Sequence, residues 1–442
     1  MLSFPSIPNL VREGKKTAVL ALPLIIGQVS HMLLMIADAI MVGKLGVTEL
    51  AALTFANAFF SVPFVFGVGL VTSISVLTST AAGAEDEAGA RAVCRNGFYL
   101  SLGAGVVLAL IGFAFLPFLD LFHQPPEVTA MTPPFLVLVL LSLIPALGSL
   151  ALKNHSDSLA QTWPGFYIFL SGVVLNVGLN WVFIFALDYG LVGAGWATLI
   201  SRCAIVIAML VWFRYSKVLA NLTPTRWIMK PDRATFRSLF ALGLPASFHL
   251  LSEVGAFSGA GFLVGHFGEV PLASHQIALT TAGTLFMIPL GIAIALTMRM
   301  GNAAGAKERN RFPAIIVSGW LLSLFFIALT ALFCIVGRVG IAELYVDNQA
   351  VVMLAAELIL IVAIFQLFDG IQVVSGGILR GLEDVTVPAW VAFISYLLIG
   401  LPAGFLLAHW AELGPHGIWW GLAIGLVIAA VVLSVRVLKV AR

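Results

Sequence analysis

Long apolar runs, separated by short polar or basic segments, follow one another along the whole chain. A helix needs about 20 mostly apolar residues to cross the hydrocarbon core of a bilayer, and twelve runs reach that length. They cover Ala18–Val42, Ala51–Thr80, Val93–Phe118, Pro133–Leu152, Gly165–Leu187, Leu191–Phe213, Ser238–His266, Leu272–Met298, Pro313–Val336, Val351–Gly376, Thr386–Ala408 and His416–Leu438. The pattern predicts an all-α integral membrane protein with twelve transmembrane helices.

The apolar runs form an internal repeat. The two halves align without a gap at an offset of 222 residues, which drifts to 224 further along. The matching positions include Leu22-Pro23 with Leu244-Pro245, Ala81-Ala-Gly-Ala84 with Ala303-Ala-Gly-Ala306, Pro164 with Pro388, and Trp196 with Trp420. We therefore expect two six-helix lobes, residues 1–213 and 238–442, joined by a basic cytoplasmic linker at 214–237. Parallel repeats of this kind predict a central cavity between the lobes.

The positions of the basic residues predict the orientation. Lysines and arginines of short loops stay on the cytoplasmic side of a membrane. With the N-terminus inside, all but three of the 23 lysines and arginines lie on cytoplasmic segments or at their edges. The exceptions are Lys44 and Arg338 outside and Arg202 within a run. Both termini are therefore expected to be cytoplasmic.

Composition excludes a water-soluble globular protein. The chain of 442 residues is 60% hydrophobic and only 10% charged, whereas soluble domains carry about 25% charged residues. The net charge is +2, and we expect no nucleic-acid partner. Three scattered cysteines, Cys94, Cys203 and Cys334, have no metal-ligand spacing and are expected to be inert packing thiols. The first apolar run has no cleavage site and is expected to remain as a helix.

Three acids lie inside otherwise apolar runs: Asp38, Glu253 and Asp369. A charged side chain at mid-membrane costs about 2.5–3.5 kcal/mol on insertion scales, so three unpaired acids would cost about 7–10 kcal/mol. They must face a cavity, pair, or bind protons or a cation. Such carboxyls can take an ion from one side and release it on the other, in competition with a passenger. That competition is the chemistry of an antiporter.

Several amides are candidates for a polar cavity. Asn176 and Asn180 stand four residues apart and project from one face of a helix. They either coordinate a cation or substrate near Asp38, or form an interhelical hydrogen bond worth about 0.6 kcal/mol. Gln28, Gln276 and Gln372 are weaker candidates of the same kind.

Two histidines and one arginine also lie within the runs. His31 and His249 can titrate, but a lone helix histidine is more often a packing group. Arg202 needs a counter-charge or a cavity, and its expected role is structural, in an internal pair.

Enzymatic motifs are missing. The chain contains no G-x-x-x-x-G-K-[ST] phosphate loop, no H-E-x-x-H and no G-x-S-x-G. Connections as short as Asp188-Tyr189-Gly190 leave no room for a soluble catalytic domain. We expect no enzyme and no cofactor, and transport driven by an ion gradient, at about 2.3 kcal/mol per charge per 100 mV.

The motifs around the embedded acids resemble the multidrug and toxic compound extrusion (MATE) family, in its bacterial NorM-type branch. The resemblance covers nearly the whole chain. It rests on Ala37-Asp-Ala-Ile-Met-Val-Gly43, Ser252-Glu-Val-Gly255, Ala273-Ser-His-Gln-Ile-Ala-Leu279 and Leu367-Phe-Asp-Gly-Ile-Gln-Val-Val-Ser-Gly-Gly-Ile-Leu-Arg-Gly381.

The resemblance implies a monomeric, multi-pass protein of the bacterial inner membrane, in contact with membrane lipids. It implies a xenobiotic transporter, giving drug resistance by exporting amphiphilic, often cationic drugs and dyes in exchange for Na⁺ or H⁺. By position, Glu253 and Asp369 would form the cation site, as ligands of Na⁺ if sodium is the coupling ion. Asp38 with Asn176 and Asn180 would form a second polar cluster.

Two points stay open at the level of sequence. Phe365, one turn before Asp369, stands where a polar aromatic would help to hold a cation, which leaves room for proton coupling. The alternative function is a flippase of lipid-linked oligosaccharides from the same superfamily. Such flippases tend to have extra spans and a strongly cationic cavity, whereas this chain has one embedded base, Arg202, against three acids.

Overall fold

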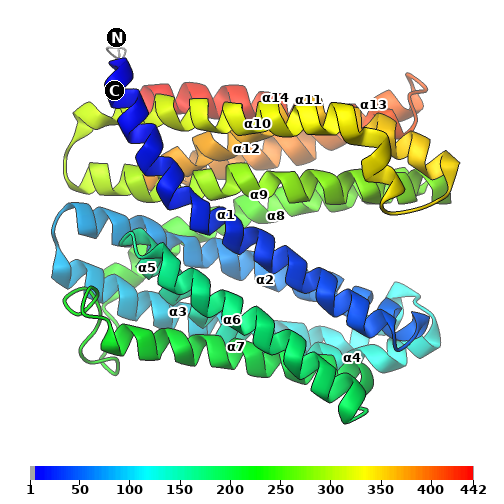
Figure 1. Cartoon of the computed structure of the whole chain (residues 1–442), viewed down its shortest axis with the longest axis horizontal. Helices are drawn as coiled ribbons and strands as arrows, with labels where there is room; N and C mark the ends of the chain where they lie inside the picture. The colour runs from blue at the N-terminus through cyan, green and yellow to red at the C-terminus, as the bar shows by residue number, and fades with distance from the viewer. Residues whose placement is uncertain (1–4, 442) are drawn as a thin grey trace. The chain divides into compact units, whose positions relative to one another are not determined.

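The computed structural model describes residues 5–441, without the side chains of His31, Leu33 and Leu34, so the prediction for His31 lies outside the described residues. All regular elements in this part of the chain are helical, and Figure 1 shows them as long rods. Twelve helical segments are long and apolar enough to cross a membrane. The expected all-α fold with twelve spans is confirmed, while the cytoplasmic location of the termini stays a prediction.

The chain forms two compact units. We call Ile26–Ser247 the N unit, and Met1–Ile25 together with Phe248–Arg442 the C unit. Two helices, α1 (Ile7–Gly43) and α8 (Arg233–Gly265), belong in part to each. The expected lobe boundaries, at 213 and 238, fall near the end of α7 (Gly190–Tyr215) and near the start of α8, and the division into those lobes stays a prediction.

Each unit contains its own helices besides these two. Those of the N unit are α2 (Val47–Gly83), α3 (Glu87–Phe115), η1 (Leu116–Phe122), α4 (Pro126–Leu141), α5 (Leu143–Ser158), α6 (Thr162–Asn180), η2 (Trp181–Ala186) and α7 (Gly190–Tyr215). Those of the C unit are α9 (Glu269–Gly305), η3 (Arg309–Arg311), α10 (Phe312–Glu343), α11 (Gln349–Gly381), α12 (Thr386–Ala392), η4 (Phe393–Gly400), α13 (Leu401–His409) and α14 (Pro415–Val440). In the C unit, α11 packs against α9, α10 and α14.

The helix ends repeat at the sequence offset. The end of α1 and both ends of α2 recur 222 residues later as the end of α8 and both ends of α9. Left-handed turn residues recur as well: Glu85 pairs with Lys307 at an offset of 222, and Asp188 with Glu412 at 224. Such backbone conformations are uncommon outside glycine, so their coincidence supports a true structural repeat.

The unit boundary also repeats. The N unit begins at Ile26 and the C unit resumes at Phe248, again 222 residues apart. Pro23 and Pro245 lie inside α1 and α8, each three residues before these positions. A proline inside a helix removes one backbone hydrogen bond and bends the helix. Both helices therefore have a built-in weak point close to the place where they change units.

Three expected spans are less regular than the apolar runs indicated. The fourth is broken at Ser142 into α4 and α5. The fifth and eleventh contain π-helical segments, η2 and η4. π-Helical turns are rare and frequently lie at functional sites. Hydrophobicity alone does not predict η2 and η4, because the residues of these segments are as apolar as those of the surrounding helices.

Ion pairs hold the beginning of α1 inside the C unit. The Glu13 carboxylate is buried and bonded by Arg299 of α9, with Arg311 at 3.5 Å. Arg299 also donates to the Glu13 backbone carbonyl at 2.6 Å and to the Thr17 hydroxyl. Further along α1, Ala21 packs in one apolar cluster with residues of α9. Helix α1 therefore begins at Ile7, before the predicted span, which begins at Ala18.

The segment between α7 and α8 lies on the N unit. His155 of α5 contacts the Leu222 carbonyl at 3.0 Å, Arg91 of α3 donates to the Asn221 carbonyl at 2.6 Å, and Asn96 accepts from the Asp232 backbone at 3.0 Å. These contacts make residues 216–232 part of the N unit's surface.

Asp232 caps the start of α8. Its carboxylate accepts from the Thr235 hydroxyl at 2.5 Å and the Thr235 backbone N–H at 3.0 Å. These two hydrogen bonds favour the ionised form and lower the pKa of Asp232 below its ordinary value. The cap satisfies one of the backbone donors that every helix start leaves open.

Candidate functional site

Two of the embedded acids lie in the same bundle of the C unit. Glu253 is on α8 and Asp369 on α11, and their charges act on one another. His249, one turn before Glu253, contacts Gln372 of α11 through their side-chain nitrogens at 3.4 Å. Because residues three and four apart share one helix face, this contact turns the Glu253 face of α8 toward the Asp369 face of α11.

Several oxygen atoms around this pair have no protein partner. Asp369, Gln372 and Tyr396 are all buried, and Asp369 Oδ1, Gln372 Oε1 and the Tyr396 hydroxyl make no hydrogen bond within the described part of the chain. The hydroxyl of Tyr396, on η4, is near enough for its charged form to interact with both carboxyls. A buried polar atom without a partner is costly, so these oxygens call for a ligand or water.

A small cavity adjoins Asp369. It has a volume of about 10 Å³ and is lined by Asp369, Gln366, Thr330 and apolar side chains. That volume holds about one water molecule. Carboxylate, amide and hydroxyl oxygens suit a hard cation such as Na⁺, and the same carboxyls suit a proton. The residues present therefore fit either Na⁺ or a proton.

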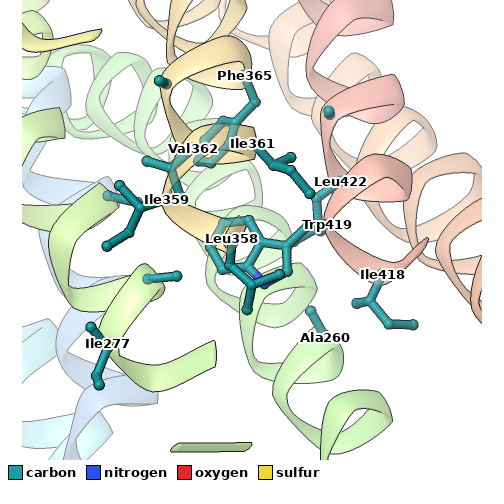
Figure 2. Packing of buried hydrophobic residues seen from close by; sticks show 14 of the residues in the cluster. Ala260, Ile277, Leu358, Ile359, Ile361, Val362, Phe365, Ile418, Trp419 and Leu422 are labelled. Atoms are coloured by element: carbon teal, nitrogen blue, oxygen red, sulfur yellow. The ribbon is translucent and has the colours of Figure 1, made fainter. Parts of the chain in front are cut away.

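The pair borders a dense apolar core. Phe365, one turn before Asp369, is 1% exposed and its ring lies 5.7 Å from that of Trp419. Figure 2 shows these two rings packed among Leu358, Val362 and Leu422. Phe365 therefore offers no oxygen to an ion. The low polarity of this core strengthens every charge interaction beside it.

The third acid belongs to a separate cluster in the N unit. The side-chain amide of Asn180 donates to Asp38 Oδ1 at 2.5 Å and to Asn176 Oδ1 at 3.0 Å. Asn176 and Asn180 are buried on α6, immediately before the π-helical segment η2. The structure thus places both asparagines and Asp38 together, as the helix-face argument expected, and joins them by hydrogen bonds. Whether this cluster also takes a cation or substrate stays a prediction.

The glutamines fall into different environments. Gln372 lies in the acid-containing bundle of the C unit, bonded to His249. Gln276 is exposed on α9, with its amide 3.5 Å from the Thr280 hydroxyl. Gln28 is half-buried on α1, and among the described residues no hydrogen bond joins it or Gln276 to either cluster. Their assignment to a cavity stays a prediction.

Two residues near Glu253 and Asp369 were not singled out from the sequence. Tyr396 is one of six tyrosines and lies in an apolar run that gives it no distinguishing pattern. Arg380 was counted as a cytoplasmic residue, but its charge reaches Glu253. Arg380 stands about three helical turns after Asp369 and therefore shares its face of α11, but its interaction with Glu253 depends on the packing of α8.

Comparisons with known proteins extend over almost all of the chain. The MatE family matches residues 23–182 and 245–406. The probable multidrug resistance protein NorM of Pseudomonas putida is 33% identical over 433 residues, 96% of this chain and 93% of that one. The multidrug resistance protein NorM of Photobacterium profundum is 31% identical and covers 97% of this chain and 96% of its own length.

Solved structures show the same fold. A mutant of the Vibrio cholerae MATE transporter VcmN has a TM-score of 0.91, with 22% identity and 98% of each chain covered. The eukaryotic MATE transporter AtDTX14 also has a TM-score of 0.91, with 21% identity and 98% of each chain covered. The family match includes the segments that carry Asp38, Asn180, Glu253 and Asp369. This multi-pass membrane protein belongs to the MatE family.

Proposed function

We propose that the protein is a multidrug efflux antiporter of the NorM type, which exports amphiphilic, often cationic organic compounds in exchange for Na⁺ or H⁺. Glu253 and Asp369 are the carboxyls that bind the coupling ion. The observation that carries the proposal is the pairing of two acids beside an apolar core, with Asp369 Oδ1 buried and lacking a partner among the described residues.

The physical basis of the proposal is that the coupling ion and a cationic drug compete for the same negative charge. Two carboxyls in a low-polarity setting cannot both stay ionised without a cation or proton. Arg380 supplies one positive charge near Glu253, which leaves the second acid to be neutralised from outside. An ion bound at Glu253 and Asp369 reduces the negative charge that attracts a cationic drug. The coupling ion and the drug therefore favour different states of the protein. The names of the NorM relatives agree with drugs as passengers.

The location follows from the same reasoning. A chain with twelve apolar helices and bacterial NorM relatives belongs in the inner membrane, where an ion gradient is available. The protein acts without an organic cofactor, as a monomer surrounded by lipid, and performs no covalent chemistry.

The test is transport of a fluorescent cationic dye in inverted membrane vesicles, with a pH gradient or a Na⁺ gradient imposed separately. Wild-type protein should move dye with one of the two gradients, which identifies the coupling ion. Glu253→Gln and Asp369→Asn should each reduce transport to background at unchanged protein level. Glu357→Gln is the matched control, because Glu357 is on α11 with Asp369 but its side chain is 57% exposed.

Normal gradient-driven export by the double variant E253Q/D369N would overturn the proposal. No dye transport by wild-type protein under either gradient, together with lost envelope synthesis in cells lacking the gene, would favour the lipid-linked oligosaccharide flippase instead.

A further inference from the structure

The segment between α7 and α8, the green loop beside the beginning of α3 in Figure 1, contains a turn that is fastened to α3. The Tyr99 hydroxyl of α3 donates to the Trp227 carbonyl and accepts from the Met229 backbone N–H at 3.2 Å. Two hydrogen bonds to one hydroxyl fix the backbone on both sides of Ile228. We call residues 226–230 the Trp227 turn.

Adjacent side chains of the Trp227 turn have opposite environments. Trp227 is half-buried, and its ring meets that of Phe98 on α3 edge-on, with 5.5 Å between the ring centres. Ile228, the next residue, is 97% exposed. Because its backbone is held on both sides, this exposure belongs to a fixed conformation. A single exposed apolar side chain is common on protein surfaces, so its meaning depends on where the turn lies.

The turn adjoins the lipid-facing side of α3. Tyr99 shares one helix face with Gly103, Val106 and Leu110, which follow it at spacings of four, three and four residues. These three residues are exposed, and α3 is part of a candidate membrane span. An exposed apolar stripe on a spanning helix contacts acyl chains. Tyr99 stands one turn before the stripe, and tyrosine is enriched at the boundary between hydrocarbon and headgroups.

The same helix becomes basic on the other side of Tyr99. Arg95, one turn earlier, directs a guanidinium N–H at the Met229 sulfur at 3.2 Å, and its Nε is buried without a partner among the described residues. Arg91, a further turn earlier, donates to the Asn221 carbonyl at 2.6 Å. Helix α3 therefore changes from charged to apolar at Tyr99, which puts the Trp227 turn at the level of the bilayer surface.

The segment around the turn is strongly basic. Its only acid between positions 214 and 237 is Asp232, whose carboxylate caps α8. The basic residues in this range are Arg214, Lys217, Arg226, Lys230, Arg233 and Arg237. Arg226 and Lys230 flank Ile228 and are exposed, and neither has an ion pair within 4.0 Å in the part of the chain that the structure describes. Positive charges on both sides of an apolar side chain match a lipid with a negative headgroup.

We propose that the Trp227 turn is a binding site for an anionic phospholipid. Arg226 and Lys230 hold the headgroup phosphate, and Ile228 inserts among the acyl chains beside the apolar stripe of α3. A free phosphate ion would use the same basic side chains but has no part that contacts Ile228, which favours the lipid. The bound lipid holds the segment between α7 and α8 at the bilayer surface. This inference goes beyond the proposed antiport and does not depend on it.

The test is quenching of a fluorophore by brominated lipids in proteoliposomes. Full-length Ile228→Cys is labelled with a thiol-reactive bimane and reconstituted into phosphatidylcholine with a minor fraction of brominated phosphatidylglycerol. A parallel sample contains brominated phosphatidylcholine in the same proportion. The phosphatidylglycerol should quench severalfold more, because each basic side chain near the surface favours anionic lipid by about fivefold. Wild-type protein taken through the same labelling measures the background from the native cysteines.

Charge variants made in the Ile228→Cys protein test the headgroup contacts. Arg226→Gln with Lys230→Gln should reduce quenching by phosphatidylglycerol to the phosphatidylcholine level. R226K/K230R keeps both charges and should resemble the parent. Lys15→Gln with Lys439→Gln is the matched control, since it removes the same charge from exposed positions outside the turn, on the same predicted side of the membrane. That pair should leave quenching unchanged.

Three results would overturn the proposal. The first is equal quenching by the two brominated lipids, and the second is unchanged quenching in R226Q/K230Q. The third is loss of quenching in millimolar inorganic phosphate but not in sodium chloride of equal ionic strength, which would assign the site to free phosphate. Thermal unfolding in detergent checks that R226Q/K230Q is folded; if it is not, the comparison of the two lipids on the Ile228→Cys protein decides alone. No transport is measured, so the result is independent of the antiport proposal.

Discussion

Glu13 and Arg299 stand 286 residues apart in the sequence and form a buried ion pair within the C unit. Arg299 is 9% exposed and Glu13 is 1% exposed. Removing one partner of a buried pair leaves an uncompensated charge, at a cost of about 3–5 kcal/mol. We expect Glu13→Gln to lower the unfolding free energy by about 3 kcal/mol, measured by denaturant titration in detergent.

A neighbouring residue provides the control for Glu13. Arg12 also approaches the Glu13 carboxylate, at 3.7 Å, but its side chain is 63% exposed. Exposed pairs contribute about 0–1 kcal/mol, so Arg12→Ala should be close to wild type. Equal losses in the two variants would contradict the importance of the buried pair.

The amide of Asn180 is expected to be needed for transport. Asn180→Ala removes the hydrogen bonds to Asp38 and Asn176. A hydrogen bond to a charged group contributes about 1.5–3 kcal/mol, so the transport rate should fall by about tenfold or more. Dye efflux per amount of membrane protein is the measurement. Asn310→Ala, at an exposed position of η3, is the control, and a normal rate in N180A would show that the cluster is dispensable.

His155 is expected to hold the segment between α7 and α8 on the N unit. It is fully buried and bridges the Thr78 hydroxyl at 2.9 Å and the Leu222 carbonyl at 3.0 Å. His155→Ala leaves both groups without this partner, at about 1–3 kcal/mol. Trypsin should then cut faster after Arg226. His266→Ala, at an exposed position, serves as control, and unchanged cutting in H155A would mean that other contacts suffice.

Gly377 is expected to tolerate no side chain. A Cβ atom there would lie 2.5 Å from the backbone oxygen of Ala293, where α11 meets α9. Backbone atoms cannot rotate away, so Gly377→Ala should destabilise the protein by about 1–3 kcal/mol, as overpacking does. Gly103→Ala meets nothing within 4 Å and should be neutral or slightly stabilising. Thermal unfolding of both variants compares them, and equal midpoints would contradict the prediction.

The Asp232 cap makes the stability of the protein depend on pH in a direction that can be predicted. Its folded pKa lies below the ordinary value of 3.8 because Thr235 donates two hydrogen bonds to the carboxylate. The cap therefore stabilises the protein above pH 3.8, and this contribution is lost as the pH falls through the folded pKa. We expect Asp232→Asn to unfold more easily than wild type at neutral pH. The difference should shrink at pH values below 3.8; a constant difference would argue against the carboxylate as its source.

Much of the fold was predictable because its signals are local. The lengths of the apolar runs predicted all twelve spans. The prolines and glycines that match between the two halves predicted the repeat, which the helix ends support. The spacing of Asn176 and Asn180 predicted a shared helix face, and the family resemblance implied that Asp38 belongs to the same cluster. The charge of each embedded acid made it conspicuous in an apolar run.

What could not be predicted depends on contacts between distant segments. Tyr396 looks like any aromatic residue of a span until η4 turns it toward the two acids of the C unit. The break at Ser142 has a local cause, since Pro145 removes the backbone hydrogen bond to Leu141, but nothing local predicts the contact of Ser142 with Arg202. The contacts of His155 with Leu222 and of Arg299 with Glu13 join residues far apart in sequence, and neither leaves a periodic pattern.

The passage of α1 and α8 from one unit to the other has a consequence for synthesis. Residues 7–25 are synthesised nearly 300 residues before their packing partners on α9 and η3. The N unit, in turn, stays unfinished until the first half of α8 is made, up to Ser247. Neither half of the gene, translated alone, encodes a complete unit, so two separately expressed fragments must exchange helix ends before either can mature.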